Sequence, residues 1–206
     1  MLNRISDISQ RKVARVAGLL YLGLIVFGIF AQVVRKNLFV PGDTATTASN
    51  IMASESLFCL AFVSDLIIIV CFLLLLLALY VVLKPVNKNH ASLMVIFVLV
   101  SVPIMFINML FHFAALLLLN GADYLIVFEA DQLYALVMFF LNLNEQGILI
   151  ASIFWGLWLF PMGYLIYKSG YFPRFLGVLV IMAGFDYLIG SFTHFFYPTT
   201  KQYSQY

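Results

Sequence analysis

Ionisable and amide side chains interrupt several strongly apolar segments of this chain. The segment FVSDLIIIVCFLLLLLALY carries one carboxylate, Asp65, about 12 Å from its predicted outer end if the segment is helical. A later segment places Asn108 about 16 Å and His112 about 10 Å from its own outer end, and the last places Asp186 about 15 Å from its own. Acids and histidines inside spanning segments are costly and commonly functional. These residue types suit a proton relay, general acid–base chemistry or a cation site.

Helical spacing gathers these residues onto faces. Ser101, Asn108 and His112 are separated by seven and then four positions, so they share one face of a helix. Two further faces combine polar with small residues: Glu145, Ser152, Gly156 and Gly163 in one segment, and Asp186, Gly190 and Thr193, with His194 beside them, in another. Small and polar faces favour contact with neighbouring helices.

If these faces converge, they form one polar pocket open to the outside, with six candidate lining residues: Asp65, Asn108, His112, Glu145, Asp186 and His194. A simpler interpretation pairs each residue with one neighbour and gives it only a role in fixing helix register. For the glycines we expect helix packing rather than ligand contact. Trp155 and Trp158 lie inside a span and either wall a cavity or simply pack.

Signatures of known cofactor and catalytic sites are missing from the sequence, which leaves the cofactor unknown. It contains no Walker A loop, no H-E-x-x-H, no G-x-S-x-G and no C-x-x-C. A zinc site from His112, His194 and an aspartate is chemically feasible, but the spacing is not diagnostic and no metal site is predicted. No lysine or arginine is expected deep in a span, which disfavours an anionic substrate.

The elements that must position these residues are spanning helices. The chain has 206 residues, of which 64% are hydrophobic and only 10% charged, whereas soluble domains are about half apolar and a quarter charged. Spans need about 20 apolar residues. We therefore predict one all-α membrane domain over 1–206. Its five spans are about 13–34, 57–83, 91–119, 147–167 and 174–196. The segment at about 132–143 is predicted to form a short outer helix or, alternatively, an extension of the fourth span.

Basic residues are distributed unevenly between the predicted loops. One side carries Arg4, Arg11, Lys12, Arg15, Lys84, Lys88, Lys168 and Arg174, and the other carries only Arg35, Lys36 and Lys201. Lysine and arginine in short loops mark the cytoplasmic side. The pattern predicts an N-terminus inside, a C-terminus outside, and a location in a prokaryotic cytoplasmic membrane.

Four stretches of the chain carry a family pattern: RKVARVAGLLYL, VPGDTATTASNIMASESLF, LKPVNK and GYLIYKSGYFPRFLGVLVIMAGFDYLIGSF. Together they resemble a prokaryotic family of multi-pass membrane proteins, domain of unknown function 4386. The resemblance covers nearly the whole chain and implies a bacterial or archaeal membrane protein without implying an activity. It also implies an acid where this chain has Gly190, so the chain departs from the family pattern there.

Our leading functional hypothesis is a binding or transport-type protein whose pocket holds a small ligand, a cation or a proton. The alternatives are a membrane-embedded enzyme acting on a lipid or isoprenoid, with Asp65 or Asp186 as general acid or base and His112 as its partner, and a structural subunit. Expected partners are the lipid bilayer and a small molecule or ion. The small, scattered net charge of +2 excludes a nucleic-acid partner, and the sequence leaves the oligomeric state open.

Overall fold

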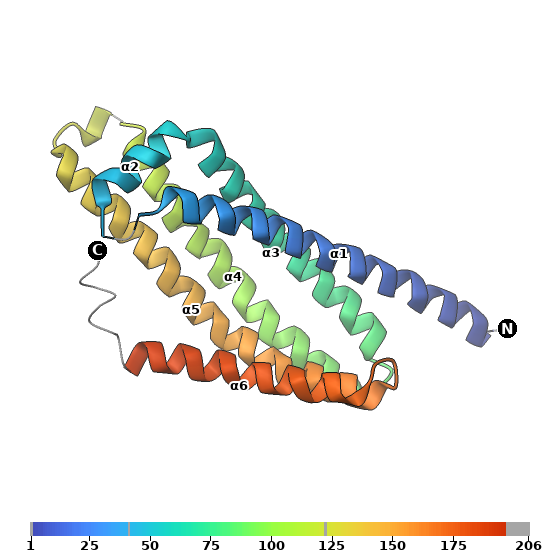
Figure 1. Ribbon diagram of the computed structural model, residues 1–206. Helices are drawn as coiled ribbons and strands as arrows, with labels where there is room; N and C mark the ends of the chain where they lie inside the picture. The colour runs from blue at the N-terminus through green and yellow to red at the C-terminus, as the bar shows by residue number, and fades with distance from the viewer. Residues whose placement is uncertain (1, 41, 122, 197–206) are drawn as a thin grey trace.

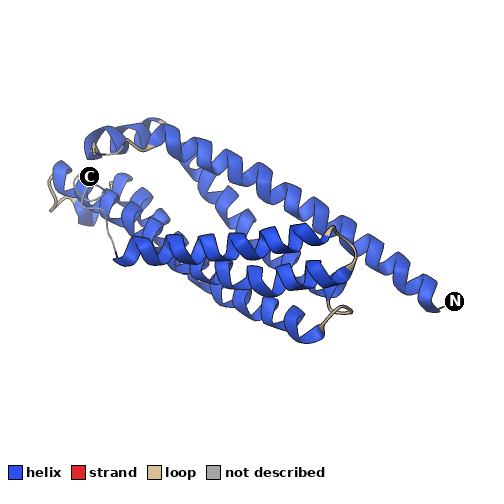
Figure 2. Ribbon diagram, turned by 60° about the horizontal axis from the view of Figure 1, so that its bottom comes forward, coloured by secondary structure: helices blue, strands red, loops and turns tan. Residues whose placement is uncertain are grey.

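The chain is built almost entirely of helices. The computed structural model describes residues 2–40, 42–121 and 123–196, and within these it contains six α-helices, a single 3-10 turn and no strand (Figures 1 and 2). The helices are α1 (Leu2–Leu38), α2 (Thr44–Ala53), α3 (Glu55–Leu83), α4 (Lys88–Leu119), α5 (Ala130–Ser169) and α6 (Arg174–Phe196). All except α2 are long and apolar enough to cross a membrane. The predicted all-α bundle with five spans is confirmed.

The segment predicted at 132–143 is not a separate helix. It forms the first part of α5, which runs unbroken for 40 residues. This agrees with the alternative prediction, in which the segment extends the fourth span. Glu129 and Gln132 form a capping box that starts the helix early, and neither proline nor glycine occurs between them and Gly147. At 1.5 Å per residue α5 is about 60 Å long, roughly twice the thickness of the hydrocarbon core.

The short helix of the fold is α2. Its N-cap is Asp43, whose carboxylate accepts a hydrogen bond from the backbone N–H of Thr46 at 2.8 Å and another from the Thr46 hydroxyl at 2.6 Å. These bonds favour the charged carboxylate and lower the pKa of Asp43. Because Gly42 turns the chain with a positive φ of 80° just before this cap, α2 begins a few residues after α1 ends.

The long helices pack in the order α1 on α3, α3 on α4, α4 on α5 and α5 on α6. One end of the bundle carries α2 together with the end of α1 and the start of α5, and we call it the α2 end (Figure 1). The opposite end, the turn end, carries the α3–α4 and α5–α6 connections (Figure 1). Lys84, Lys88, Lys168 and Arg174 lie at the turn end, the side that the charge pattern predicts to be cytoplasmic.

Glycines bring α5 and α6 into backbone contact. A Cβ atom added to Gly163 would lie 2.7 Å from the carbonyl oxygen of Gly177, and one added to Gly177 would lie 2.6 Å from that of Gly163. Gly156 and Gly184 repeat this contact one heptad away. The predicted packing role of Gly156 and Gly163 is confirmed, because no larger residue fits at this crossing.

The buried face of α6 differs from the predicted one. It consists of Gly177, Gly184 and Ser191, spaced by seven, and the Ser191 hydroxyl lies 2.7 Å from that of Ser152 on α5. Asp186, Gly190 and Thr193 are exposed, and a Cβ atom on Gly190 would meet nothing within 4 Å. The expectation that this second stripe faces the neighbouring helices was wrong, because the glycine heptad gives closer backbone contact than the Asp186 face.

Two apolar clusters form the core. The cluster near the α2 end includes Val34 of α1, Ile51 of α2, Phe58 of α3 and Val137 of α5. The second includes Leu76 of α3, Met94 and Val98 of α4, and Leu165 of α5. Through Ile51, α2 closes the first cluster, which the buried residues of α5 join from Val137 onward.

Candidate functional site

An ion pair joins α1 to α3. Arg35 Nη1 lies 2.5 Å from Asp65 Oδ2, and the two side chains are 26% and 15% exposed. We had placed Arg35 in an outer loop, away from any span, and this was wrong. The helix continues past the apolar run to Leu38, whose carbonyl oxygen accepts a hydrogen bond from the Asn50 amide at 3.3 Å. This extension turns Arg35 towards α3 and gives Asp65 a partner of opposite charge.

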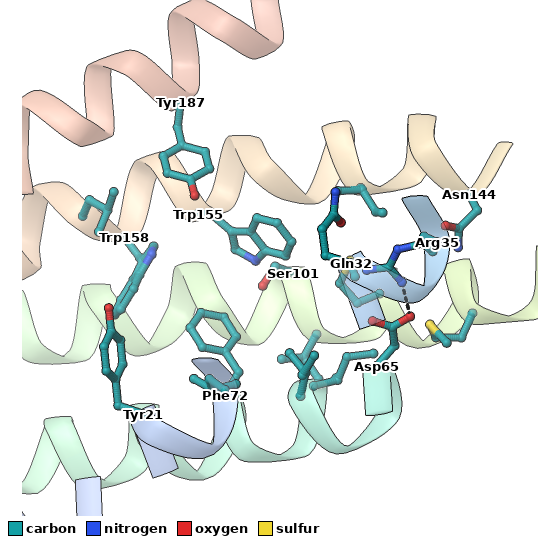
Figure 3. Close-up of a pocket in the computed structure, with 18 residues that line it drawn as sticks. Tyr21, Gln32, Arg35, Asp65, Phe72, Ser101, Asn144, Trp155, Trp158 and Tyr187 are labelled. Atoms are coloured by element: carbon teal, nitrogen blue, oxygen red, sulfur yellow. Dashed lines mark hydrogen bonds and ion pairs between the residues drawn. The ribbon is translucent and has the colours of Figure 1, made fainter. Parts of the chain in front are cut away.

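The ion pair borders a cavity of about 540 Å³ inside the bundle. All five long helices contribute to its wall (Figure 3). Its polar or aromatic lining residues are Tyr21, Gln32, Arg35, Asp65, Phe72, Ser101, Asn144, Trp155, Trp158 and Tyr187. A cavity of this size is typical of small-molecule sites, which span about 300–1,000 Å³.

The chemistry of the wall changes along the cavity. Arg35 and Asp65 lie at one end, Tyr21 and Trp158 lie at the other, and Phe72 and Trp155 lie between them (Figure 3). The indole N–H of Trp155 is buried and finds no hydrogen-bond partner within residues 2–40, 42–121 and 123–196. The cavity is therefore charged at one end and aromatic at the other.

Asn108 and Asn144 form a closed clamp between α4 and α5. The side-chain amide of Asn108 donates to the backbone carbonyl oxygen of Asn144 at 2.8 Å. In return, the side-chain amide of Asn144 donates to the backbone carbonyl oxygen of Asn108 at 3.1 Å. A Cβ atom on Gly147 would lie 2.0 Å from Asn108 Oδ1, a buried oxygen without a hydrogen-bond partner among the described residues, so a larger residue fits only if the Asn108 side chain moves. Asn108 is used in this clamp and does not line the cavity, whereas Asn144 borders it.

His112 is enclosed by aromatic rings. It is 1% exposed, and its ring centroid lies 4.5 Å from that of Phe58 and 5.8 Å from that of Phe62. Nε2 has no hydrogen-bond partner in the part of the chain that the structure describes. Phe62 precedes Asp65 by one helical turn, so His112 lies near the ion pair but outside the cavity wall.

The remaining three predicted residues lie elsewhere. Asp186 is exposed, and the cavity is lined instead by its neighbour Tyr187. Glu145 is exposed on α5, within electrostatic range of the half-buried His194 on α6. Of the six candidates only Asp65 lines the cavity. In the part of the chain that the structure describes, no three His, Cys, Asp or Glu side chains gather as metal ligands.

Sequence reasoning missed most of the cavity wall. On α1, Tyr21, Gln32 and Arg35 are spaced by eleven and three positions, which places them on one face. This spacing was available, but the assignment of Arg35 to a loop concealed it. Trp155 and Trp158 were noted as possible wall residues, and both line the cavity.

Comparison with known proteins identifies relatives. Residues 16–205 match a family described as "Domain of unknown function (DUF4386)". A protein from Archaeoglobus fulgidus described as "Uncharacterized protein" is 32% identical over 118 residues, and the match spans 57% of either chain. No solved structure matches the chain significantly.

Proposed function

Because the chain belongs to the DUF4386 family of multi-pass membrane proteins, whose function is unknown, we propose its function from the geometry of the cavity. The protein binds a small ligand inside the membrane, in the cavity bordered by Arg35 and Asp65. The ion pair holds the polar part of this ligand. The proposed activity is binding, and transport of the bound molecule would be a further step beyond it.

The observation that carries this proposal is an ion pair with free hydrogen-bonding capacity beside a cavity. A guanidinium has five N–H donors, and among the described residues Arg35 bonds one partner, Asp65. Asp65 likewise uses only one of its two carboxylate oxygens in the contact with Arg35. A charge pair in an apolar bundle contributes little to stability on balance, because desolvation offsets attraction. Its placement on a cavity wall gives it a use that packing alone does not require.

The ligand reaches this site from the α2 end or from the surrounding lipid. The charge pattern predicts that the α2 end faces outside, and the polar wall of the cavity lies towards that end. The second apolar cluster, which contains Leu76, Met94 and Leu165, closes the route from the turn end. An outward or lateral opening follows from this asymmetry.

The test uses the two tryptophans as reporters. The chain contains only Trp155 and Trp158, and both line the cavity. The full-length protein in nanodiscs is titrated with a panel of probes, namely linear alcohols, alkylamines, alkyl carboxylates and their short water-soluble homologues. We expect saturable changes in tryptophan emission for at least one class of probe.

Arg35→Gln and Asp65→Asn are then compared with Asp186→Asn, a matched change at an exposed acid. Loss of the saturable change in the first two variants only, with folding retained, supports binding. Equal destabilisation by Arg35→Gln and Asp65→Asn, with no saturable probe in the wild type, assigns the pair a purely structural role and refutes the proposal.

A further inference from the structure

We infer that the cavity holds one hydrocarbon chain of a single-chain amphiphile with an uncharged hydroxyl or carbonyl head group, which enters sideways from the lipid between α1 and α6. This inference rests on the proposed binding function of the same cavity and adds the class of ligand and its route. Four features carry it: the shape of the cavity, the polarity along its wall, the exposure of its two tyrosines, and the charge balance at its polar end.

The cavity is elongated along the bundle. Its wall on α1 runs from Tyr21 to Arg35, which is about 21 Å along the helix axis, and its wall on α5 runs from Asn144 to Leu159, about 22 Å. A volume of about 540 Å³ extends over this length. An extended hydrocarbon chain follows such a space better than a compact solute does.

The middle of the cavity has no charged group. Between the ion pair and the aromatic end the wall is formed by side chains such as Ile68, Val102, Met105 and Ile148. An apolar chain buries its surface there at a gain of about 25 cal/mol per Å². A small polar solute would leave this part of the cavity unfilled, whereas an amphiphile matches both its charged end and its apolar length.

The aromatic end opens towards lipid. Tyr21 of α1 and Tyr187 of α6 line the cavity and yet are 59% and 44% exposed. Among the described residues, α1 and α6 are not among the extensively packed helix pairs, so these tyrosines flank an opening between them. Most exposed residues beside the tyrosines are apolar, with Leu22 and Ile25 on α1 and Phe185 and Ile189 on α6, whereas Asp186 adds one exposed carboxyl next to Tyr187. A molecule dissolved in the bilayer meets this opening directly.

The polar end favours an uncharged head group. Arg35 and Asp65 together carry no net charge, and each retains hydrogen-bonding capacity that their mutual contact does not use. A hydroxyl can donate to the Asp65 carboxylate while it accepts from the Arg35 guanidinium. A phosphate or carboxylate head would meet the negative charge of Asp65 at the same point, which weakens its binding in a medium of low dielectric constant.

The experiment titrates the full-length protein in nanodiscs with primary alcohols, from octanol to octadecanol, that carry bromine near the end of the chain. Bromine quenches a tryptophan that it contacts, so a chain in the cavity quenches Trp155 and Trp158. We expect saturable quenching that the unbrominated alcohol reverses. The alkyl phosphate and the alkane of equal chain length compete at least about tenfold more weakly, as expected when about 1.4 kcal/mol of head-group interaction is lost.

A matched pair of variants locates the chain. Ile148→Phe enlarges a side chain of the cavity wall, and Ile150→Phe makes the same change two residues away at a position that is 45% exposed. A larger side chain in the cavity lowers the affinity for a bound hydrocarbon chain at least about tenfold. We expect this loss for Ile148→Phe and unchanged affinity for Ile150→Phe.

The outcomes separate this inference from the proposed function. If quenching by every brominated chain is linear and not reversed by competitor, while a short polar probe still binds in a manner dependent on Arg35 and Asp65, the amphiphile inference fails and the binding site stands. If the alkyl phosphate competes better than the alcohol, the assignment of an uncharged head group is wrong. If no probe of any class binds saturably, both proposals fail.

Discussion

Two polar pairs at neighbouring levels of the bundle differ in the space beside them. The Asn108–Asn144 clamp exchanges two hydrogen bonds across α4 and α5, and Gly147 leaves just enough room for it. The Arg35–Asp65 pair joins α1 and α3 by one contact and faces a cavity of about 540 Å³. The difference indicates that polar residues in a membrane bundle are distinguished by the space beside them, not by residue type.

The largest effect on stability is expected at the clamp. Gly147→Ala places a Cβ atom 2.0 Å from Asn108 Oδ1 and forces the two helices or the amide to move. We expect the free energy of unfolding to fall by about 2–3 kcal/mol. Denaturant unfolding in micelles or nanodiscs measures this loss. Gly190→Ala is the control, because its Cβ atom would meet nothing within 4 Å; equal losses in the two variants would contradict a closed clamp.

A smaller effect on stability is expected at the ion pair. Arg35→Gln and Asp65→Asn each leave one charge without its partner, and because the pair is partly exposed we expect a loss of about 1–2 kcal/mol. The double variant leaves no unpaired charge and should recover most of that loss. A double-mutant cycle on unfolding free energies measures the coupling. If the double variant loses as much unfolding free energy as the two single variants together, the two residues do not act as a pair.

A still smaller effect is expected at Asp186. This acid is exposed on α6 and does not line the cavity. Asp186→Asn should change the unfolding free energy by no more than about 0.5 kcal/mol, as for other substitutions outside packed regions. It should also leave probe binding unchanged. A loss of binding comparable to that of Asp65→Asn would restore Asp186 to the site.

The most local effect is expected at the cap of α2. The hydrogen bonds from Thr46 lower the pKa of Asp43, so the charged cap stabilises α2 at neutral pH, and this contribution is lost as the pH falls through the folded-state pKa, below the ordinary carboxyl range. Asp43→Ala should therefore increase hydrogen exchange in α2 at neutral pH and make it less sensitive to acid. An unchanged exchange rate at neutral pH would show that packing of Ile51 alone holds the helix.

The sequence predicted the spans well because a long apolar run is sufficient to identify one. It also predicted that Gly156 and Gly163 pack, because small residues at a spacing of seven share a face. It did not predict where α1 ends, since the helix continues into polar residues beyond the apolar run and carries Arg35 into the bundle. Hydropathy marks the part of a helix in lipid, not its full length.

The candidate site was harder to predict for a similar reason. Asp65 was identified from its cost in lipid, but its partner was taken for a loop residue, so the convergence on Arg35 was missed. Asp186 looked equivalent to Asp65 by depth, yet rotation about the α6 axis decides which side it faces. That rotation is set by the contact of Gly177 and Gly184 with α5, which depth alone does not reveal.

The most direct test of the central claim is the affinity of the Arg35→Gln/Asp65→Asn double variant for the brominated alcohol that binds the wild type most tightly, read from quenching of Trp155 and Trp158. The claim is that the pair holds a ligand rather than only locking α1 to α3. It predicts a double variant of nearly normal stability with affinity reduced at least about tenfold. Wild-type affinity in a stable double variant would contradict the claim.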